Sequence, residues 1–230
     1  MRTLGLIGGM SWESTQSYYR LINEGVKARL GGLHSARLVL FSVDFAEIEA
    51  LQAQGDWVRA GMILSDAARS LKAAGAEGLV LCTNTMHKVA SAIEGVGLPL
   101  IHIADATAEV VKAQGIQRIG LLGTRFTMEQ SFYAGRLGRY GLQVLTPEEA
   151  GREQVHRIIY DELCLGQIHA SSRQIYRDIM TDLVTRGAEG IIFGCTEIGL
   201  LVSSQDSAVP VFDTTALHAQ AAVEWALGPA

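Results

Sequence analysis

The sequence predicts an α/β protein with two pseudosymmetric lobes, each a short parallel sheet flanked by helices, with the active site in the inter-lobe cleft. Two observations predict this class. First, uninterrupted apolar runs alternate with helical patterns along all 230 residues, which is typical of parallel strands covered on both faces. Second, GAEGLVLCTNT at 75–85 aligns without gaps on GAEGIIFGCTE at 187–197, 112 residues later. A period of this length indicates duplicated lobes and not a solenoid of short repeats.

Strands and helices follow each other in the order that the apolar runs dictate. Short runs rich in Leu, Ile and Val predict strands, and longer stretches with apolar residues at helical spacing predict helices. The GAEG turns introduce two of the strands, and Ser11 is a plausible N-cap for the first helix. The predicted strands cover 3–7, 37–42, 78–81, 100–101, 118–122, 143–145, 190–193 and 211–212. The predicted helices cover 14–30, 45–50, 56–74, 86–96, 104–113, 128–140, 151–165, 171–186 and 214–227.

Two further pairs of segments repeat at nearly the same interval. Residues 4–9 resemble 119–124, and residues 98–102 resemble 209–213, at intervals of 115 and 111 residues. Buried parallel strands have similar compositions, and for the proline-containing second pair alone this is the simpler explanation. Three pairs in one order favour an internal duplication.

Composition excludes several classes of protein. Hydrophobic residues make up 48% of the chain and charged residues 19%, which is typical of a globular protein. The net charge of −5 argues against nucleic acid as a partner, because nucleic-acid binders usually carry a basic surface. The sequence has no leader with a basic start and no apolar stretch long enough to span a bilayer. We therefore expect no membrane partner and a cytoplasmic location.

Cysteine and histidine spacing gives no indication of a metal site. Cys82, Cys164 and Cys195 form no CxxC pair, and the six histidines show no HxxxH or HExxH spacing. In a reducing compartment these cysteines remain thiols. Each is therefore a core residue, a nucleophile or a base, and we expect no metal.

Ligands of parallel α/β folds lie beyond the carboxyl ends of the strands, so the loops at these ends are the candidate sites. The amides of the loop at 8–11 (GGMS) could bind a carboxylate, although a tight turn is the simpler explanation. This loop has neither the GxGxxG spacing nor the lysine of nucleotide-binding loops. Its counterpart at 123–127 offers hydroxyl groups, including that of Thr124.

Cys195 is the strongest candidate for chemistry, whereas Cys82 is best explained as packing at the end of a buried strand. Gly194 before Cys195 and Thr196-Glu197 after it are typical of a loop that starts a helix. Amides and the helix dipole at such a position lower the pKa of a thiol below its ordinary value of about 8.5. A thiolate there could remove a proton or attack a carbonyl.

Three motifs together resemble the aspartate/glutamate racemase superfamily. They are CTE at 195–197 after an apolar strand, NTMH at 84–87 after another, and GGMS at 8–11 near the start of the chain. The resemblance covers essentially the whole chain and is closest to the aspartate racemase branch and its broad-specificity amino-acid racemase relatives. The glutamate racemase branch opens with a loop of Asp-Ser-Gly type, which residues 8–10 do not match.

The resemblance implies a cofactor-independent (PLP-independent) isomerase that racemises amino acids. In this family one residue removes the α-proton from one face of the substrate, and a second residue protonates the carbanion from the other face. Both are normally cysteines. Carried over by position, these catalytic residues fall on Thr83 and Cys195. The expected substrate-binding residues are Met10, Gln52, Asn84, Thr85, Thr124, Cys164, Thr196 and Glu197.

The resemblance also implies a domain organisation. The N-terminal lobe is expected to comprise 1–103 plus 214–230, because the C-terminal helix should return to pack on it, and the C-terminal lobe 104–213. The expected ligand is a small-molecule amino-acid substrate, with no cofactor. A homodimer is expected because the family often forms dimers.

Two departures from the family pattern bear on the activity. Thr83 stands where a cysteine is usual, and an alcohol is a weaker acid and base than a thiol, so the two directions of proton transfer should be unequal. Cys164 stands where aspartate racemases tend to have a lysine, and Gln52 where an arginine often helps. Without these two cations we expect weak preference for aspartate and tolerance of uncharged side chains, such as those of homoserine and methionine.

Three alternatives remain open. A single cysteine also suits a decarboxylase of arylmalonate type in the same superfamily, because that reaction needs one proton donor. A two-lobed protein that lost its first cysteine could instead be a non-catalytic amino-acid-binding relative. Cys82 could also replace Thr83, although neighbouring strand residues face opposite ways.

Overall fold

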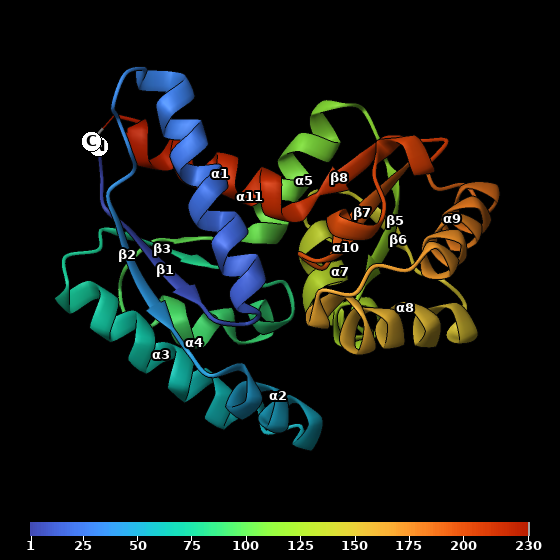
Figure 1. Ribbon diagram of the computed structural model, residues 1–230, viewed down its shortest axis with the longest axis horizontal. Helices are drawn as coiled ribbons and strands as arrows, with labels where there is room; N and C mark the ends of the chain where they lie inside the picture. The colour runs from blue at the N-terminus through green and yellow to red at the C-terminus, as the bar shows by residue number, and fades with distance from the viewer. Residues whose placement is uncertain (230) are drawn as a thin grey trace. The chain divides into compact units, whose positions relative to one another are not determined.

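The computed structural model describes residues 1–229, which divide into two compact units. Unit 1 comprises Met1–Ile103 with the segment that begins at His218, and unit 2 comprises Ala104–Leu217. Each unit contains a four-stranded parallel sheet covered by helices (Figure 1). The predicted α/β class with two lobes is confirmed.

The sheet of unit 1 has the strand order β2-β1-β3-β4, with every neighbouring pair parallel. Parallel neighbours require crossover connections, which the intervening helices supply. The strands are β1 (Leu4–Gly8), β2 (Leu38–Ser42), β3 (Gly78–Leu81) and β4 (Leu100–Ile101). The helices are α1 (Trp12–Leu30), α2 (Phe45–Gln54), α3 (Trp57–Ala73), the 3₁₀ helix η1 (Thr85–Val89), α4 (Ala90–Glu94) and, from His218 onward, α11 (Thr214–Leu227).

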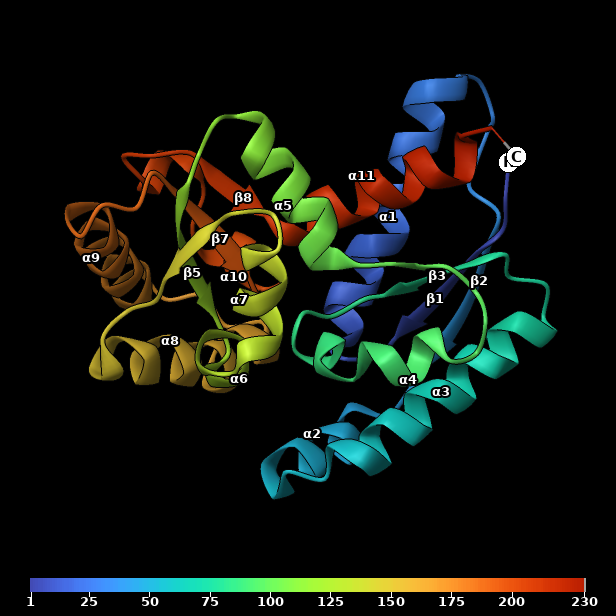
Figure 2. The same cartoon turned by 180° about the vertical axis from the view of Figure 1, so that it is seen from behind.

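Different helices cover the two faces of this sheet because strand side chains alternate between the faces. Leu4 and Leu6 of β1 pack with α1 and α11, and Cys82 after β3 belongs to the same core. Ile7 and Leu81 face the other way and pack with α2, α3 and η1. The ribbon views agree, with α1 and α11 on one side of the strands and α3 and α4 on the other (Figures 1 and 2).

The sheet of unit 2 repeats this topology, with the parallel order β6-β5-β7-β8. Its largest core lies between the sheet and the helices α8 and α9. The strands are β5 (Arg118–Gly123), β6 (Gln143–Leu145), β7 (Gly190–Gly194) and β8 (Val211–Asp213). The helices are α5 (Ile103–Ala113), α6 (Arg125–Glu129), α7 (Ser131–Gly138), α8 (Glu149–Asp161), η2 (Leu163–Leu165), α9 (Ala170–Thr185), α10 (Ile198–Leu201) and η3 (Ser204–Asp206).

The three repeated sequence pairs occupy equivalent strands of the two sheets. The pair at 4–9 and 119–124 forms β1 and β5, and the GAEG pair leads into β3 and β7. The proline-containing pair leads into β4 and β8. The strand order is the same in both units once these pairs are matched, so the sequence repeat corresponds to a structural repeat.

The structure also refines the predicted helices. The helix expected over 86–96 is a 3₁₀ turn followed by α4, the one expected over 128–140 is divided at Gln130, and the one expected over 151–165 is divided at Glu162. The short elements α10 and η3 follow β7 and have no counterpart among the predictions. Within residues 1–229, every helix is either too short or too polar to cross a bilayer.

Candidate functional site

The strand order of each sheet selects two loops as the natural site for a ligand. In unit 1 the chain passes from β1 outward to β2 and then returns to the other side of β1 as β3. The loops after β1 and β3 therefore diverge at the sheet's carboxyl edge, where α/β folds bind ligands. The loops after β5 and β7 occupy the same position in unit 2.

We call the residues at these edges the first and second loop clusters. The first loop cluster consists of residues 8–11, Gln52 and residues 82–87. The second loop cluster consists of Thr124, Cys164 and residues 195–197. The two clusters are chosen to include the ten residues predicted for the site, of which Gln52 lies in α2 and Cys164 in η2, outside the strand-end loops.

The loop after β1 is tightly folded against its own unit. Gly9 has a φ of +94°, and a Cβ there would lie 2.2 Å from the carbonyl oxygen of Val43, so only glycine fits. The Gly9 amide donates to Thr15 Oγ1 at 2.8 Å, and Ser11 caps α1 by accepting from the Ser14 amide. Met10 is buried beside α2. The loop is therefore a tight turn, as expected, and one of its amides is already occupied.

The loop after β3 carries Thr83, Asn84 and Thr85, all of which are buried. The adjacent Cys82 is wholly buried among apolar side chains, and burial raises the pKa of its thiol above the ordinary value. A thiol in that environment is inert packing, because it belongs to the core on the α1 side of the sheet. The hypothesis that Cys82 replaces Thr83 finds no support in this geometry.

Gln52 is tied to the same loop through the residue that follows Thr85. It lies in α2 and is buried, and its amide nitrogen donates to Met86 Sδ at 2.9 Å. Met10 and Met86 belong to one apolar core cluster. Gln52 is therefore joined to the loop after β3 through Met86, and Met10 belongs to the same core as Met86.

Paired glycines bring the loops of the second cluster close together. Gly123 and Gly194 are partners in the β5–β7 register. A Cβ on Gly123 would lie 2.8 Å from the Gly194 carbonyl oxygen, and a Cβ on Gly194 would lie 2.9 Å from that of Leu122. Thr124 and Cys195 leave the sheet side by side from this contact. Thr124 is buried and caps α6 by accepting from the Thr127 amide.

Cys195 is hydrogen-bonded to a carboxylate two residues later in the chain. Its thiol donates to Glu197 Oε2 at 2.9 Å, and the hydroxyl of Thr196 donates to the same oxygen at 2.6 Å. Cys195 is 8% exposed and Glu197 4% exposed. The CTE motif is therefore a compact unit in which one buried oxygen accepts two hydrogen bonds.

The acidity of Cys195 differs from the prediction. Burial, then the Glu197 carboxylate and then Cys164 hold the pKa of the Cys195 thiol well above its ordinary value. The prediction of a lowered pKa was wrong because α10 begins only at Ile198 and has four residues, so its dipole is weak. Desolvation and a neighbouring negative charge both favour the neutral thiol, which is the resting form.

Cys164 and Tyr176 complete the surroundings of this thiol. Cys164 packs against the core that contains Cys195, and it is one of the groups that raise the pKa of Cys195. Tyr176 is wholly buried in the same core, and the pKa of its phenol is raised by burial and by nearby Cys195. Tyr176 was not predicted, and apolar residues around it in α9 give no sequence signal for such a neighbour. Cys164 and Glu197 thus lie beside Cys195, and Thr196 is joined to them through Glu197. Thr124 is related to Cys195 through the backbone contact of Gly123 with Gly194.

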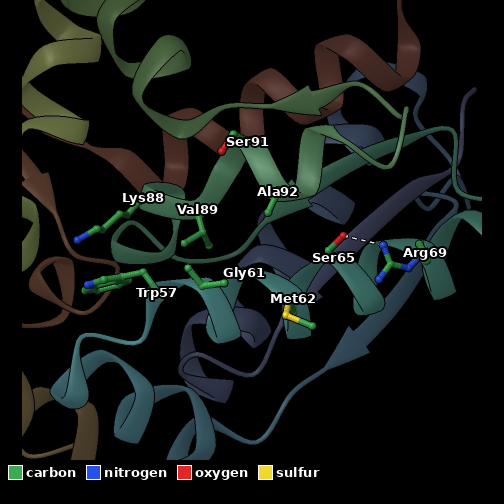
Figure 3. A pocket seen from close by; sticks show the side chains of 10 residues that line it. Trp57, Gly61, Met62, Ser65, Arg69, Lys88, Val89, Ser91 and Ala92 are labelled. Atoms are coloured by element: carbon green, nitrogen blue, oxygen red, sulfur yellow. Dashed lines mark hydrogen bonds between the residues drawn. The ribbon is translucent and has the colours of Figure 1, made fainter.

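A surface groove of about 490 Å³ lies elsewhere in unit 1, between α3 and the η1–α4 segment (Figure 3). Its lining includes Trp57, Met62 and Lys88. Lys88 Nζ lies 3.9 Å from the centroid of the Trp57 ring, a cation–π contact. No predicted site residue lines this groove. Across residues 1–229, no group of three or more His, Cys, Asp or Glu side chains is arranged to hold a metal ion.

Comparison with known proteins places these clusters in context. The family model described as Asp/Glu/Hydantoin racemase matches residues 7–222. A crystal structure of a candidate Asp/Glu racemase from Yersinia pestis is 64% identical over 99% of this chain and 100% of that chain, with a TM-score of 0.93. An aspartate racemase homologue from Pyrococcus horikoshii OT3 is 34% identical over 98% of this chain and 99% of that chain, with a TM-score of 0.85. The aspartate racemase of Picrophilus torridus shares the fold, at 20% identity, 96% and 95% coverage and a TM-score of 0.72.

Proposed function

Because this chain belongs to the Asp/Glu/hydantoin racemase family, we propose that it is a cofactor-independent amino-acid racemase in which Cys195 and Thr83 act on opposite faces of the substrate Cα. The observation that carries the proposal is the equivalence of these two residues. In each unit the chain crosses from the second strand to the far side of the first strand, where it forms the third strand of that unit. Thr83 follows this third strand in unit 1 (β3), and Cys195 follows it in unit 2 (β7). Two-sided proton transfer needs one acid–base group from each side, and a duplicated fold supplies equivalent positions for them.

The hydrogen bond between Cys195 and Glu197 supports Cys195 as the base. The resting thiol must lose its proton before it can accept the α-proton, and Glu197 Oε2 lies 2.9 Å away to receive it. In the forward direction the thiol proton moves to Glu197, and the thiolate takes the α-proton and leaves a carbanion. The Thr83 hydroxyl then protonates the carbanion from the other face, and solvent restores the Thr83 proton. Glu197 releases the proton that it received to solvent, so every group regains its starting form, and atoms and charges balance over the full sequence.

Thr83 is better suited to giving a proton than to taking one. A carbanion is a strong base and accepts a proton even from a weak acid, whereas a neutral alcohol is a poor base towards Cα–H. The asymmetry between Thr83 and Cys195 therefore predicts unequal rates of α-proton removal from the two enantiomers. This inequality is the signature that distinguishes this chain from a racemase with two cysteines.

The specificity follows from the uncharged side chains at two positions. Cys164 contributes a thiol beside Cys195, and Gln52 contributes an amide that is bonded to Met86. Neither supplies the charge-assisted hydrogen bond that would hold a substrate's side-chain carboxylate. We therefore expect homoserine and methionine to be accepted beside aspartate.

Solvent exchange at Cα tests the proposal directly. The L- and D-forms of aspartate, homoserine and methionine are incubated separately in D₂O with the protein, and loss of the α-proton is followed by ¹H NMR while chiral chromatography follows inversion. One enantiomer, the one deprotonated by Cys195, should exchange rapidly and its mirror image slowly. Cys195→Ser should abolish rapid exchange, and Thr83→Cys should accelerate the slow one. Cys82→Ala is the matched control and should leave both rates unchanged.

Three results would contradict this function. Equal exchange of both enantiomers by the wild-type protein would remove the assigned asymmetry between Thr83 and Cys195. Release of CO₂ from an arylmalonate without α-proton exchange in any amino acid would indicate a decarboxylase. Stabilisation of the protein by amino acids without exchange or inversion would indicate a binding protein.

A further inference from the structure

We propose that His87, together with Ser14, positions Thr83 for proton transfer by fixing the two peptide groups on either side of it. This inference rests on the proposed racemase function, because it assigns these residues a purpose only if Thr83 meets the substrate. Neither His87 nor Ser14 belongs to the predicted set of site residues. Both lie in unit 1. His87 is part of the first loop cluster, and Ser14 lies three residues after its segment 8–11.

The backbone around Thr83 is held by side chains and not only by the sheet. Ser14 Oγ donates to the carbonyl oxygen of Cys82 at 3.0 Å, which is nearer than its other acceptor, the Ser11 carbonyl oxygen at 3.3 Å. His87 Nδ1 lies 2.7 Å from the carbonyl oxygen of Thr83. These carbonyls belong to the peptide groups immediately before and after the Thr83 Cα. Two fixed peptide planes determine φ and ψ of the residue between them, and so fix the direction of its Cα–Cβ bond.

The hydrogen-bond partners of His87 assign its tautomer. A carbonyl oxygen can only accept, so Nδ1 must carry the proton that is donated to Thr83. The other ring nitrogen, Nε2, then has a lone pair, and it accepts from the Ile103 amide at 3.3 Å. His87 is 3% exposed, and this neutral tautomer satisfies both nitrogens. The ring therefore links the Thr83 carbonyl to the first residue of α5.

Neighbouring rings keep the imidazole of His87 in place. The His102 ring lies edge-on with its centroid 4.4 Å away, and that of His218 lies 5.7 Å away. His218 is fixed in turn, because its Nε2 lies 2.6 Å from the Ile101 carbonyl oxygen and its Nδ1 lies 2.8 Å from the Tyr18 hydroxyl. All of these rings are buried in unit 1. A ring that contacts two neighbouring rings and is hydrogen-bonded at both nitrogens can act as a rigid support.

The same 3₁₀ helix carries a second anchor on its outer surface. Lys88 follows His87 in η1 and lies over the Trp57 ring on the groove side of the helix (Figure 3). This contact joins η1 to α3, whereas the contact to the Thr83 carbonyl comes from the imidazole of His87. Lys88 therefore provides a control that separates the stability of η1 from the specific support of Thr83.

Thr83 needs such support more than a cysteine would. An alcohol gains little from a favourable pKa, so its contribution depends on the geometry of approach to the carbanion. Displacement of a reacting group by about 1 Å can reduce a rate by about 100-fold. Cys195 is in unit 2 and has its own partner in Glu197, so loss of the His87 support should affect only the face served by Thr83.

The test compares two variants of His87. In each variant the side-chain amide places a polar atom near the position of one nitrogen of the imidazole. In His87→Asn the side-chain amide can still donate at the position of Nδ1, towards the Thr83 carbonyl. In His87→Gln the longer side chain reaches the position of Nε2 and can accept from Ile103, but the donor to Thr83 is lost. The measured quantity is the rate of inversion divided by the rate of α-proton exchange on the Cys195 face, in the same sample. Unfolded protein contributes to neither rate, so this ratio is independent of the folded fraction.

We expect His87→Gln to lower this ratio by between about tenfold and about 100-fold, and His87→Asn to retain it within about threefold. Lys88→Gln should leave it unchanged. If His87→Gln gives no folded protein, Ser14→Ala takes its place, since it releases the preceding peptide and should also lower the ratio. Equal ratios in the Asn and Gln variants, or an unchanged ratio in Ser14→Ala, would overturn the inference while leaving the racemase function intact. A wild-type protein with neither inversion nor exchange would overturn both.

Discussion

Glu197 controls the acidity of the Cys195 thiol, and its replacement by glutamine should make that thiol more reactive near neutral pH. Two effects act in the same direction. The carboxylate accepts the thiol proton at 2.9 Å, which stabilises the neutral form, and its negative charge opposes formation of the thiolate. Glu197→Gln removes the charge while retaining the size of the side chain, so the pKa of Cys195 should fall.

The magnitude follows from the strength of the lost interaction. A hydrogen bond to a charged group contributes about 1.5–3 kcal/mol, which corresponds to an increase of about 10- to 150-fold in the thiolate fraction well below the pKa. A less basic thiolate is also less nucleophilic, and about half of the logarithmic gain is lost for this reason. The alkylation rate at a fixed pH should therefore rise by about 3- to 12-fold.

Alkylation by iodoacetamide measures this change. The Cys164→Ser background leaves Cys195 and the wholly buried Cys82 as the remaining thiols, and mass spectrometry identifies which one reacts. In the wild-type protein the alkylation rate of Cys195 should still increase at pH values above the pKa of an ordinary thiol. In Glu197→Gln the whole curve of alkylation rate against pH should be shifted to lower pH. Glu162→Gln is the matched control, because it removes a carboxylate of the same unit that is bonded to Ser172 at 2.5 Å. Equal or slower alkylation of Glu197→Gln would refute the assigned role.

Two further predictions follow from specificity and from stability. Gln52→Arg combined with Cys164→Lys should shift kcat/KM towards aspartate over homoserine, since each added cation can form a charge-assisted hydrogen bond worth about 1.5–3 kcal/mol; unchanged specificity would argue against these positions. Burial lowers the pKa of His218 to about 4, so the folded protein keeps it neutral while the unfolded chain protonates it below about pH 6.5. The contribution of His218 to the free energy of unfolding is therefore fully present above pH 6.5 and is lost as the pH falls towards 4. Between pH 7 and pH 5 this free energy should decrease by about 2 kcal/mol. Urea unfolding at these two pH values should show that His218→Gln removes this difference, and an unchanged pH dependence would contradict it.

Much of the fold could be predicted because it depends on local patterns and on repetition. The strands at 78–81, 100–101 and 143–145 and the helix at 214–227 have the predicted bounds, since apolar runs between turn signals determine them locally. The helix expected over 128–140 is divided at Gln130, which adopts extended backbone angles. Its apolar periodicity continues across the break, so periodicity alone did not reveal it.

The places of the candidate residues beyond the strand ends could be predicted, but their electrostatics could not. The repeat and the motifs identified Thr83, Cys195 and Glu197 as neighbours of strand ends. The direction of the pKa shift at Cys195 was predicted wrongly, because the sequence does not show that Glu197 folds back onto the thiol or that α10 begins only at Ile198. A pKa depends on burial and on charges within a few ångströms, and these are set by folding.

The fold class, the duplication and the family could be predicted from the order of the amino acids, because each is encoded in the order of apolar runs and in short motifs. The side chains that support those motifs became known only from the folded chain. Ser14 and His87 are distant from each other in sequence, yet they hold the carbonyl oxygens on either side of Thr83. Hydrogen bonds act over about 3 Å, and only packing of α1 and η1 against the same strand end brings these groups within that range.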